Sequence, residues 1–357
     1  MASPVWSPGS SPRRAAAAAV VAAGLVAVAG LAYVKWLPYY HRLLAVSLTH
    51  ALGSSLFGPE GYFTAVNLGV AWSYAVEYFR SVWQAALLGL VLGGAVEAVL
   101  PATWIQRLLG ARPRAVALAG LFALPGMMCS CCATPVVAGL RRQSASAGAA
   151  VAFWLANPVL NPATLAVLVM VLGWPFGLVR LIFGVLMVFG IGLLVDRLFP
   201  EERHPPQAAT TGHPATRTPH PASASWPVRW LRSTLRLAAW IVPEYLVMVF
   251  LTGLLGGVFF PAGIGQWAHA PLALPLIALA GTLFVIPTMA EIPIVQGLMA
   301  VGLPTGPAAA LLLTLPAVSL PGLVILGRSF RARTLGVVTL AVTLVGVAGG
   351  LVAAALL

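Results

Sequence analysis

The sequence predicts an all-α polytopic membrane protein built from two inverted repeats. The chain of 357 residues is 60% hydrophobic and 8% charged, whereas soluble domains carry about 25% charged residues. Several apolar runs are long enough to cross a bilayer as helices. The helix breaks and small residues of the first half recur in the second half at a constant spacing.

An N-terminal region, residues 1–75, precedes the repeats. Arg13 and Arg14 lead into an apolar run at 15–34, which is longer than the core of a signal peptide. We therefore expect a first transmembrane helix rather than a cleaved leader. The aromatic-rich remainder is typical of a segment at the membrane interface, with room for a short helix near 62–79.

Two permease repeats follow, separated by a polar linker. The first is expected at 76–196 and the second at 229–357. The linker at 197–228 is rich in Pro, His, Thr and Ser, a composition typical of disorder. Each repeat contains four apolar segments, at 76–100, 115–140, 146–172 and 174–196, and at 237–260, 272–300, 304–327 and 334–357.

One stretch at 125–135, Pro-Gly-Met-Met-Cys-Ser-Cys-Cys-Ala-Thr-Pro, interrupts an apolar run and holds all three cysteines, Cys129, Cys131 and Cys132. Pro125 ends one helix, and Thr134 and the proline after it have the pattern of the start of the next. Irregular backbone at membrane depth occurs only where protein or water covers it. An odd number of clustered cysteines favours soft-metal binding or thiol chemistry over a disulfide framework. It also favours these functions over the alternative that the cysteines are only small apolar side chains packed in the core.

A spacing of 158 residues relates the two halves without a gap. In this register Cys131, Cys132 and Ala133 correspond to Met289, Ala290 and Glu291, so a carboxylate replaces the sulfurs. The matched breaks and small residues are Pro135, Gly139, Gly148 and Pro158 against Pro293, Gly297, Gly306 and Pro316.

The basic residues predict the topology. If 115–140 and 272–300 are re-entrant hairpins, sixteen of the twenty Lys and Arg residues are cytoplasmic, against nine if these segments are full spans. The positive-inside rule favours the hairpins and a cytoplasmic N-terminus in the plasma membrane. Each half then has three spans and one hairpin, which is the inverted-repeat plan of secondary transporters. The four residues left outside are Lys35, Arg42, Arg80 and Arg180.

The cysteine stretch resembles a known family. Leu-Pro-Gly-Met-Met-Cys-Ser-Cys-Cys-Ala-Thr-Pro-Val-Val-Ala-Gly-Leu-Arg-Arg, followed by Ala-Asn-Pro-Val-Leu-Asn-Pro, is similar to the ArsP/YraQ family of predicted permeases over roughly residues 75–355. Characterised ArsP members export trivalent organoarsenicals, so the resemblance implies a soft, thiophilic substrate. Cys132 stands where glycine is usual in the family.

Further polar residues lie in or next to the apolar segments. Thr134, Asn157 and Asn161 are candidate substrate-binding residues, although both asparagines are equally placed to cap helices. Carboxylates inside membranes are functional by default, so Glu291 and Glu97 are candidates for proton coupling. Glu291 is also a candidate substrate-binding residue opposite the sulfurs, or alternatively lies at the interface of a shorter hairpin. Glu244 and the arginine pair Arg141-Arg142 are weaker candidates, the pair being most simply a topology signal.

The sequence thus predicts a transporter and not an enzyme. Lys35 is the one lysine of the chain and lies outside any P-loop motif, so ATP hydrolysis by this chain is not expected. The function predicted is secondary export of a thiophilic metalloid or metal species, similar to a trivalent organoarsenical. Alternatives are a membrane thiol–disulfide carrier and a structural subunit for a separate ATPase. The expected partners are the bilayer and a small thiophilic substrate, without cofactor or nucleic acid, and a homo-oligomer remains open.

Overall fold

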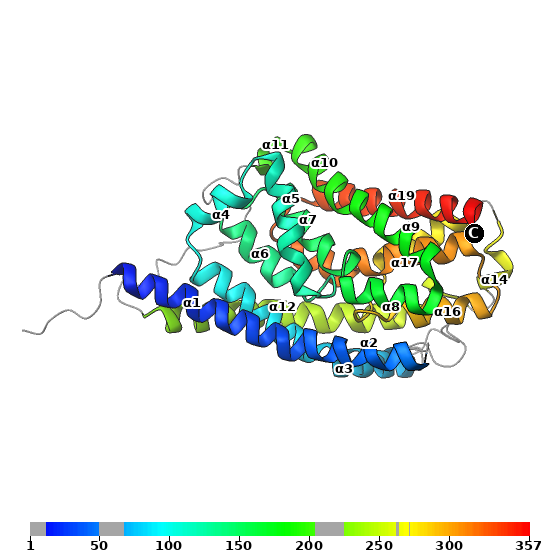
Figure 1. The fold of residues 1–357 in the computed structure, drawn as a ribbon, viewed down its shortest axis with the longest axis horizontal. Helices are drawn as coiled ribbons and strands as arrows, with labels where there is room; N and C mark the ends of the chain where they lie inside the picture. Colours follow the sequence, from blue (N-terminus) through cyan, green and yellow to red (C-terminus); the bar gives the residue numbers. More distant parts are fainter. Residues whose placement is uncertain (1–11, 50–67, 204–224, 262–263, 271) are drawn as a thin grey trace, which may run out of the picture.

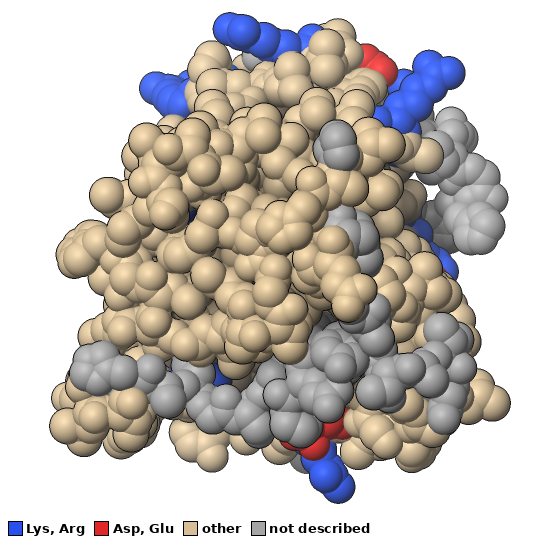
Figure 2. Space-filling model, turned by 90° about the vertical axis from the view of Figure 1, so that its right-hand side faces the viewer, with Lys and Arg blue, Asp and Glu red and all other residues tan. Residues whose placement is uncertain are grey.

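The structure, a computed structural model, describes residues 12–49, 68–203, 225–261, 264–270 and 272–357. This part of the chain is all-helical, and seven of its helical segments are long and apolar enough to cross a membrane. Residues 50–67 and most of the predicted linker, 204–224, lie outside the described residues. Charged side chains gather at the two ends of the face in Figure 2, with a broad uncharged band between them.

The N-terminal helix is longer than predicted. Helix α1 (Pro12–Leu31) continues through a π-helical turn, η1 (Ala32–Trp36), into α2 (Leu37–Thr49). Residues 16–49 form one apolar rod of 34 residues, so an interfacial segment from residue 35 is wrong for this part. The π-helical turn lies directly before Pro38, whose missing N–H interrupts the regular bonding, and the helix continues beyond it.

The first half begins at α3, eight residues before the expected residue 76, because the aromatic residues there are helical rather than interfacial. Its remaining elements are short helices separated by Gly, Pro and Asn. In order they are α3 (Leu68–Ala98), α4 (Ala102–Leu109), α5 (Pro113–Ala123), η2 (Leu124–Gly126), α6 (Thr134–Arg142), α7 (Ala147–Val159), α8 (Pro162–Leu172), α9 (Trp174–Val185), η3 (Leu186–Gly190), α10 (Ile191–Leu198) and α11 (Pro200–Arg203).

The second half repeats this order of elements. It comprises α12 (Trp226–Leu254), α13 (Gly256–Phe259), α14 (Ile264–Trp267), α15 (Ala273–Leu283), α16 (Glu291–Ala300), α17 (Thr305–Ala317), α18 (Leu320–Leu326) and α19 (Ala332–Leu356). Helices α17, α18 and α19 each start 158 residues after α7, α8 and α9. The left-handed residues after α6 and α16, Ser144 and Gly302, keep the same spacing.

Two pairs of half-length helices interrupt the bundle. Helices α5 and α6 have 11 and 9 residues, and α15 and α16 have 11 and 10. At 1.5 Å per residue, each is about 14–17 Å long, whereas the hydrocarbon core is about 30 Å thick. None of these helices can cross the bilayer alone, and α5 also bends by 107° from α4.

The core lies between two layers of helices. In Figure 1, α1, α3 and α12 run along one side, α9, α10 and α19 along the other, and α7 and α17 between them. Nearly every residue of α7 and α17 is buried. Helix α3 approaches the half-helix α6 closely at Gly93, where a Cβ atom would lie 2.6 Å from the carbonyl oxygen of Pro135. A glycine is required there because any side chain would collide with backbone.

Candidate functional site

The three cysteines converge in the break between α5 and α6. The chain leaves η2 through Met127, which has a left-handed φ of 46°. Cys129, Cys131 and Cys132 are free thiols, each at most 3% exposed, and their sulfur atoms all lie within 4.8 Å of one another. The Cys129 and Cys131 sulfurs are 3.3 Å apart. Among the described residues this is the cluster able to hold a metal ion, as the sequence predicts.

Two tyrosines, one from each half, bind the sulfur of Cys131. Tyr78 on α3 and Tyr245 on α12 place their hydroxyl oxygens 2.9 Å and 3.0 Å from this sulfur, and 2.9 Å from each other. Both side chains are buried. Sequence reasoning missed these residues because aromatic residues in apolar segments are common. The thiol therefore lies at the contact between the two halves.

Polar contacts hold the cysteine loop in place. The Thr134 hydroxyl donates to the carbonyl of Cys131 at 2.6 Å, and the Trp154 indole donates to the carbonyl of Ser130 at 2.7 Å. The Ser130 hydroxyl donates to that of Ser319, 3.0 Å away, between α17 and α18. The cap of α6 is Ala133, one residue before the expected Thr134. Since both halves fix this loop, movement between them would move the sulfurs.

The two asparagines have different roles. Asn157 accepts from the backbone N–H of Met128 at 3.4 Å, so it touches the cysteine loop directly. Asn161 caps α8 by accepting from the N–H groups of Ala163 and Thr164 at 3.0 Å and 3.2 Å. The structure thus brings Asn157 to the loop and gives Asn161 a helix-capping position.

The N-terminal helix also contacts the loop. The Trp36 indole donates to the carbonyl of Pro125 at 2.9 Å, and the Tyr39 hydroxyl donates to that of Met127 at 3.2 Å. The Lys35 ammonium donates to the Tyr39 hydroxyl at 3.4 Å and is 5% exposed. A mostly apolar cavity of about 330 Å³ lies between α1 and the bundle, and Asn157 contributes to its wall.

Glu291 forms a fully buried ion pair with Arg180. Glu291 is the first residue of α16, and its carboxylate lies 2.9 Å from the Arg180 guanidinium on α9. Arg180 also donates to the carbonyls of Pro158 and Val159 at 3.0 Å and 3.2 Å. The charge count placed Arg180 and Lys35 outside the membrane, and this is wrong because both side chains are buried in the protein.

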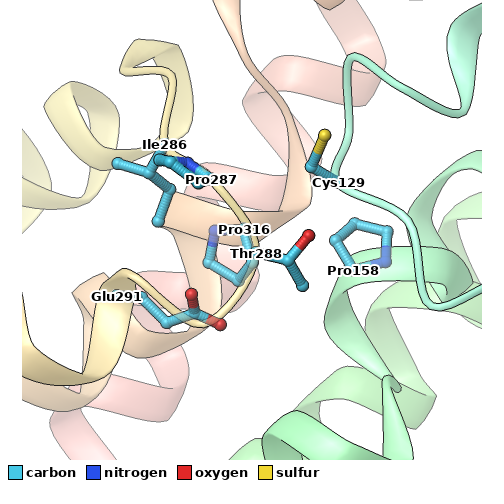
Figure 3. Close-up of a pocket in the computed structure, with 7 residues that line it drawn as sticks. All are labelled: Cys129, Pro158, Ile286, Pro287, Thr288, Glu291 and Pro316. Atoms are coloured by element: carbon cyan, nitrogen blue, oxygen red, sulfur yellow. The ribbon is translucent and has the colours of Figure 1, made fainter. Parts of the chain in front are cut away.

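The cysteine and the carboxylate line the same small cavity (Figure 3). Cys129 lies on one side and Glu291 on the other, with Thr288 between them in this view. The rest of the wall comes from helix breaks of both halves, at Pro158, Ile286, Pro287 and Pro316. The structure therefore brings together the sulfurs of one half and the carboxylate of the other.

The other predicted carboxylates lie outside this cavity. Glu97 pairs with Arg142 at 2.8 Å and with Arg236 at 3.9 Å. Glu244 pairs with Arg328. These pairs are partly exposed and connect α3 with α6 and α12, and α12 with the segment after α18. Only the pair of Glu97 and Arg236 joins the two halves, and none of these residues lines the cavity.

Broken helices that meet at buried sulfurs and a buried ion pair, within a bundle of membrane-length helices, define a multi-pass membrane protein with an internal polar site. The family model ArsP_1, described as a predicted permease, matches residues 70–355. The chain therefore belongs to this family of predicted permeases, which implies a transporter rather than an enzyme. No solved structure matches the chain.

Two relatives show how much of the chain is shared. The chain is 44% identical to the UPF0718 protein YraQ of Escherichia coli over 329 residues, which cover 92% of each chain. It is 22% identical to the UPF0718 protein MJ0584 of Methanocaldococcus jannaschii, over 75% of this chain and 91% of the relative. The similarity to YraQ is too extensive to be confined to residues 70–355, so it includes part of the N-terminal region.

Proposed function

We propose that this chain is a secondary permease that exports a thiophilic metalloid or metal species through the cysteine site. One observation carries the proposal: three free thiols, all buried, gather within 4.8 Å where two half-length helices meet. Soft thiolate ligands select soft ions and metalloids. A trivalent organoarsenical is one such substrate, which the family resemblance suggests.

Inverted repeats would give this site access to both sides of the membrane. The seven membrane-length segments divide into one N-terminal segment, three in the first half and three in the second. An odd number of crossings per half turns the second half upside down relative to the first. Broken helices at the centre of such a pair are typical of alternating-access transporters.

Glu291 is proposed to couple transport to protons. Its carboxylate faces the same cavity as Cys129, so substrate and proton would share one chamber. Arg180 is its partner and also holds the carbonyls at the end of α7. A proton that neutralises Glu291 would release Arg180, and this would change the contact between α9 and α16.

Uptake into everted vesicles tests the proposal. We expect wild-type vesicles to accumulate As(III), methylated As(III), Sb(III), Cu(I) or Hg(II), and expect Cys131→Ser to abolish uptake at an unchanged protein level. Glu291→Gln should retain ligand binding and lose uphill transport and its pH dependence. Glu77→Gln, which removes an exposed carboxylate from α3, is the matched control. Full activity of the variant with all three cysteines changed to serine contradicts the proposal.

A thiol–disulfide carrier is the second candidate, favoured by the 3.3 Å between the sulfurs of Cys129 and Cys131. Such a carrier needs an exchange partner, and the corresponding positions of the second half are Met289, Ala290 and Glu291. A redox titration of the purified protein separates the two functions. A carrier shows a reversible two-electron transition, whereas the permease binds its ligand only with all thiols reduced.

A further inference from the structure

Lys35 is a buried cation next to the cysteine loop. It lies in the π-helical turn of the N-terminal rod, with its ammonium bonded to Tyr39, which in turn bonds to the loop at Met127. The ammonium also lies 5.4 Å from the centre of the Tyr39 ring. It is close enough to Cys129 and Cys132 for a direct electrostatic interaction with both. An ionisable residue at such a place in a membrane protein is expected to have a function.

The charge of Lys35 is not balanced by a carboxylate from the part of the chain that the structure describes. Within the described part of the chain, none of the ion pairs involves Lys35. The other buried cation near the cysteines, Arg180, is balanced by Glu291. When all three cysteines are protonated thiols, the interior around the sulfurs carries one surplus positive charge, which is unfavourable in a medium of low dielectric constant.

We propose that Lys35 selects the ligand of the cysteine site by charge. The site takes soft cations that form thiolate complexes with a single negative charge, namely a monovalent ion on two sulfurs or a divalent ion on three. This inference rests on the proposed function and narrows its substrate class.

The charge balance follows from the chemistry of the thiols. When each metal–sulfur bond forms, an S–H bond breaks and the proton leaves to water, without electron transfer. With arsenite, each As–S bond replaces an As–O bond, and the thiol proton leaves with the displaced hydroxide as water. A monovalent ion on two thiolates and a divalent ion on three each carry one negative charge, which the Lys35 ammonium neutralises. Trivalent arsenic on three thiolates, or a monoalkyl arsenic on two, is already neutral. With such a ligand the surplus positive charge of Lys35 remains buried.

The sulfur positions fit these complexes. Three sulfurs around one ion, with bonds of about 2.3 Å, lie about 4 Å from one another in a trigonal arrangement. The cysteine sulfurs are all within 4.8 Å of one another, and the Cys129–Cys131 pair is at 3.3 Å. Small shifts of the loop are therefore enough for two or three sulfurs to bind one ion.

Competitive binding to the full-length protein in detergent micelles tests the inference. Ag(I), Hg(II) and arsenite are each equilibrated with the protein against glutathione, and bound metal is measured by mass spectrometry. We expect Lys35→Met to weaken Ag(I) and Hg(II) binding on the order of 10- to 100-fold and leave As(III) binding unchanged or tighter. Lys35→Arg should keep the wild-type order of affinities for the three ligands, because the positive charge is retained. Arg42→Met, which removes an exposed charge from the same rod, and Tyr39→Phe, which keeps the ammonium, are the controls.

The outcomes separate this inference from the proposed function. Equal effects of Lys35→Met on all three ligands, or no effect on any, overturn the charge selection. Unchanged binding after all three cysteines are replaced by serine overturns the proposed function instead. If Lys35→Met does not fold, the wild-type protein decides by comparison with a free peptide of residues 125–135. The wild-type protein must exceed the peptide in affinity by a larger factor for Ag(I) and Hg(II) than for As(III). An equal or smaller factor for Ag(I) and Hg(II) refutes the inference.

Discussion

The buried pair of Arg180 and Glu291 offers a stringent test, because its two members differ in how they respond to the loss of the partner. The perturbation is a double-mutant cycle of Arg180→Met, Glu291→Gln and the double variant. Both side chains are at most 1% exposed and their charged atoms are 2.9 Å apart. Removing one partner of such a pair typically costs about 3–5 kcal/mol, since an unbalanced charge is left inside.

The two single variants differ in their pH dependence. Arginine cannot lose its proton, so the cost of Glu291→Gln should be the same at pH 5.5 and pH 7.5. It should lie near the lower limit, about 3 kcal/mol, because the carbonyls of Pro158 and Val159 still accept from Arg180. In Arg180→Met a proton can neutralise the Glu291 carboxylate. The free energy of unfolding should then fall by about 4 kcal/mol at pH 7.5 and by about 1.5 kcal/mol at pH 5.5.

The sign follows from proton linkage. The folded Arg180→Met variant binds one more proton than its unfolded chain, so its stability falls as the pH rises. Unfolding titrations in mixed micelles with increasing denaturing detergent measure these free energies at both pH values. The double variant should cost about 3 kcal/mol less than the sum of the two single variants at pH 7.5, and this difference is the coupling energy. A pH-independent Arg180→Met, or a double variant as unstable as the sum of the single ones, refutes the reasoning.

Three further predictions concern the surroundings of the site. Gly93→Ala should cost about 1–3 kcal/mol because its Cβ would lie 2.6 Å from the Pro135 carbonyl oxygen, whereas Gly336→Ala, with open space around it, should not destabilise in the same unfolding titration. Tyr245→Phe should cost only about 1 kcal/mol, since the remaining groups still pair, but should weaken Hg(II) binding; unchanged binding would show that the hydroxyl is only structural. In a cysteine-free background, Arg142→Cys should resist an impermeant maleimide added from outside, and efficient labelling would favour full spans over hairpins.

The breaks of the fold could be predicted from the sequence because they depend on local chemistry. Clustered proline and glycine disfavour helical backbone, and this was enough to predict the half-length helices, the cysteine loop and the spacing of the halves, although single prolines such as Pro158 and Pro316 lie inside helices. The length of the N-terminal helix was missed because tyrosine and tryptophan between 33 and 40 are equally typical of an interface and of a helix that faces lipid.

The partners of the site could not be predicted, because they depend on contacts between distant segments. Tyr78 and Tyr245 are 167 residues apart, and Arg180 meets a carboxylate more than a hundred residues later. The only local signal was a charged residue inside an apolar segment, at Lys35 and Arg180. Charge counting treats every such residue as part of a loop, which is wrong for a buried one.

This error does not weaken the topology argument. Lys35 and Arg180 were two of the four basic residues assigned to the outside, and both are buried in the protein. Only Arg42 and Arg80 then remain outside. Arg141, which the proposed hairpin topology places inside, is also buried, so that topology leaves fifteen basic residues against two. The positive-inside rule concerns charges that must stay in water on one side of the membrane. A charge buried inside the protein falls under a different rule, and leaving out all three buried residues makes the ratio of inside to outside charges larger.

The same distinction explains why the two halves can share a scaffold and differ in chemistry. Helices α17, α18 and α19 start 158 residues after α7, α8 and α9, and each half also contains a pair of half-length helices that meet at a break. Glycine and proline set this geometry, and they recur. Of the residues that line the cavity, Pro158 and Pro316 correspond to each other, whereas Cys129 corresponds to Pro287 and Glu291 corresponds to Ala133. A site assembled from two equivalent breaks would be symmetric, and a symmetric site cannot bind a ligand and a proton at different groups. In the proposed function, the sulfurs of one half would bind the ligand and the carboxylate of the other half would bind the proton, next to one cavity.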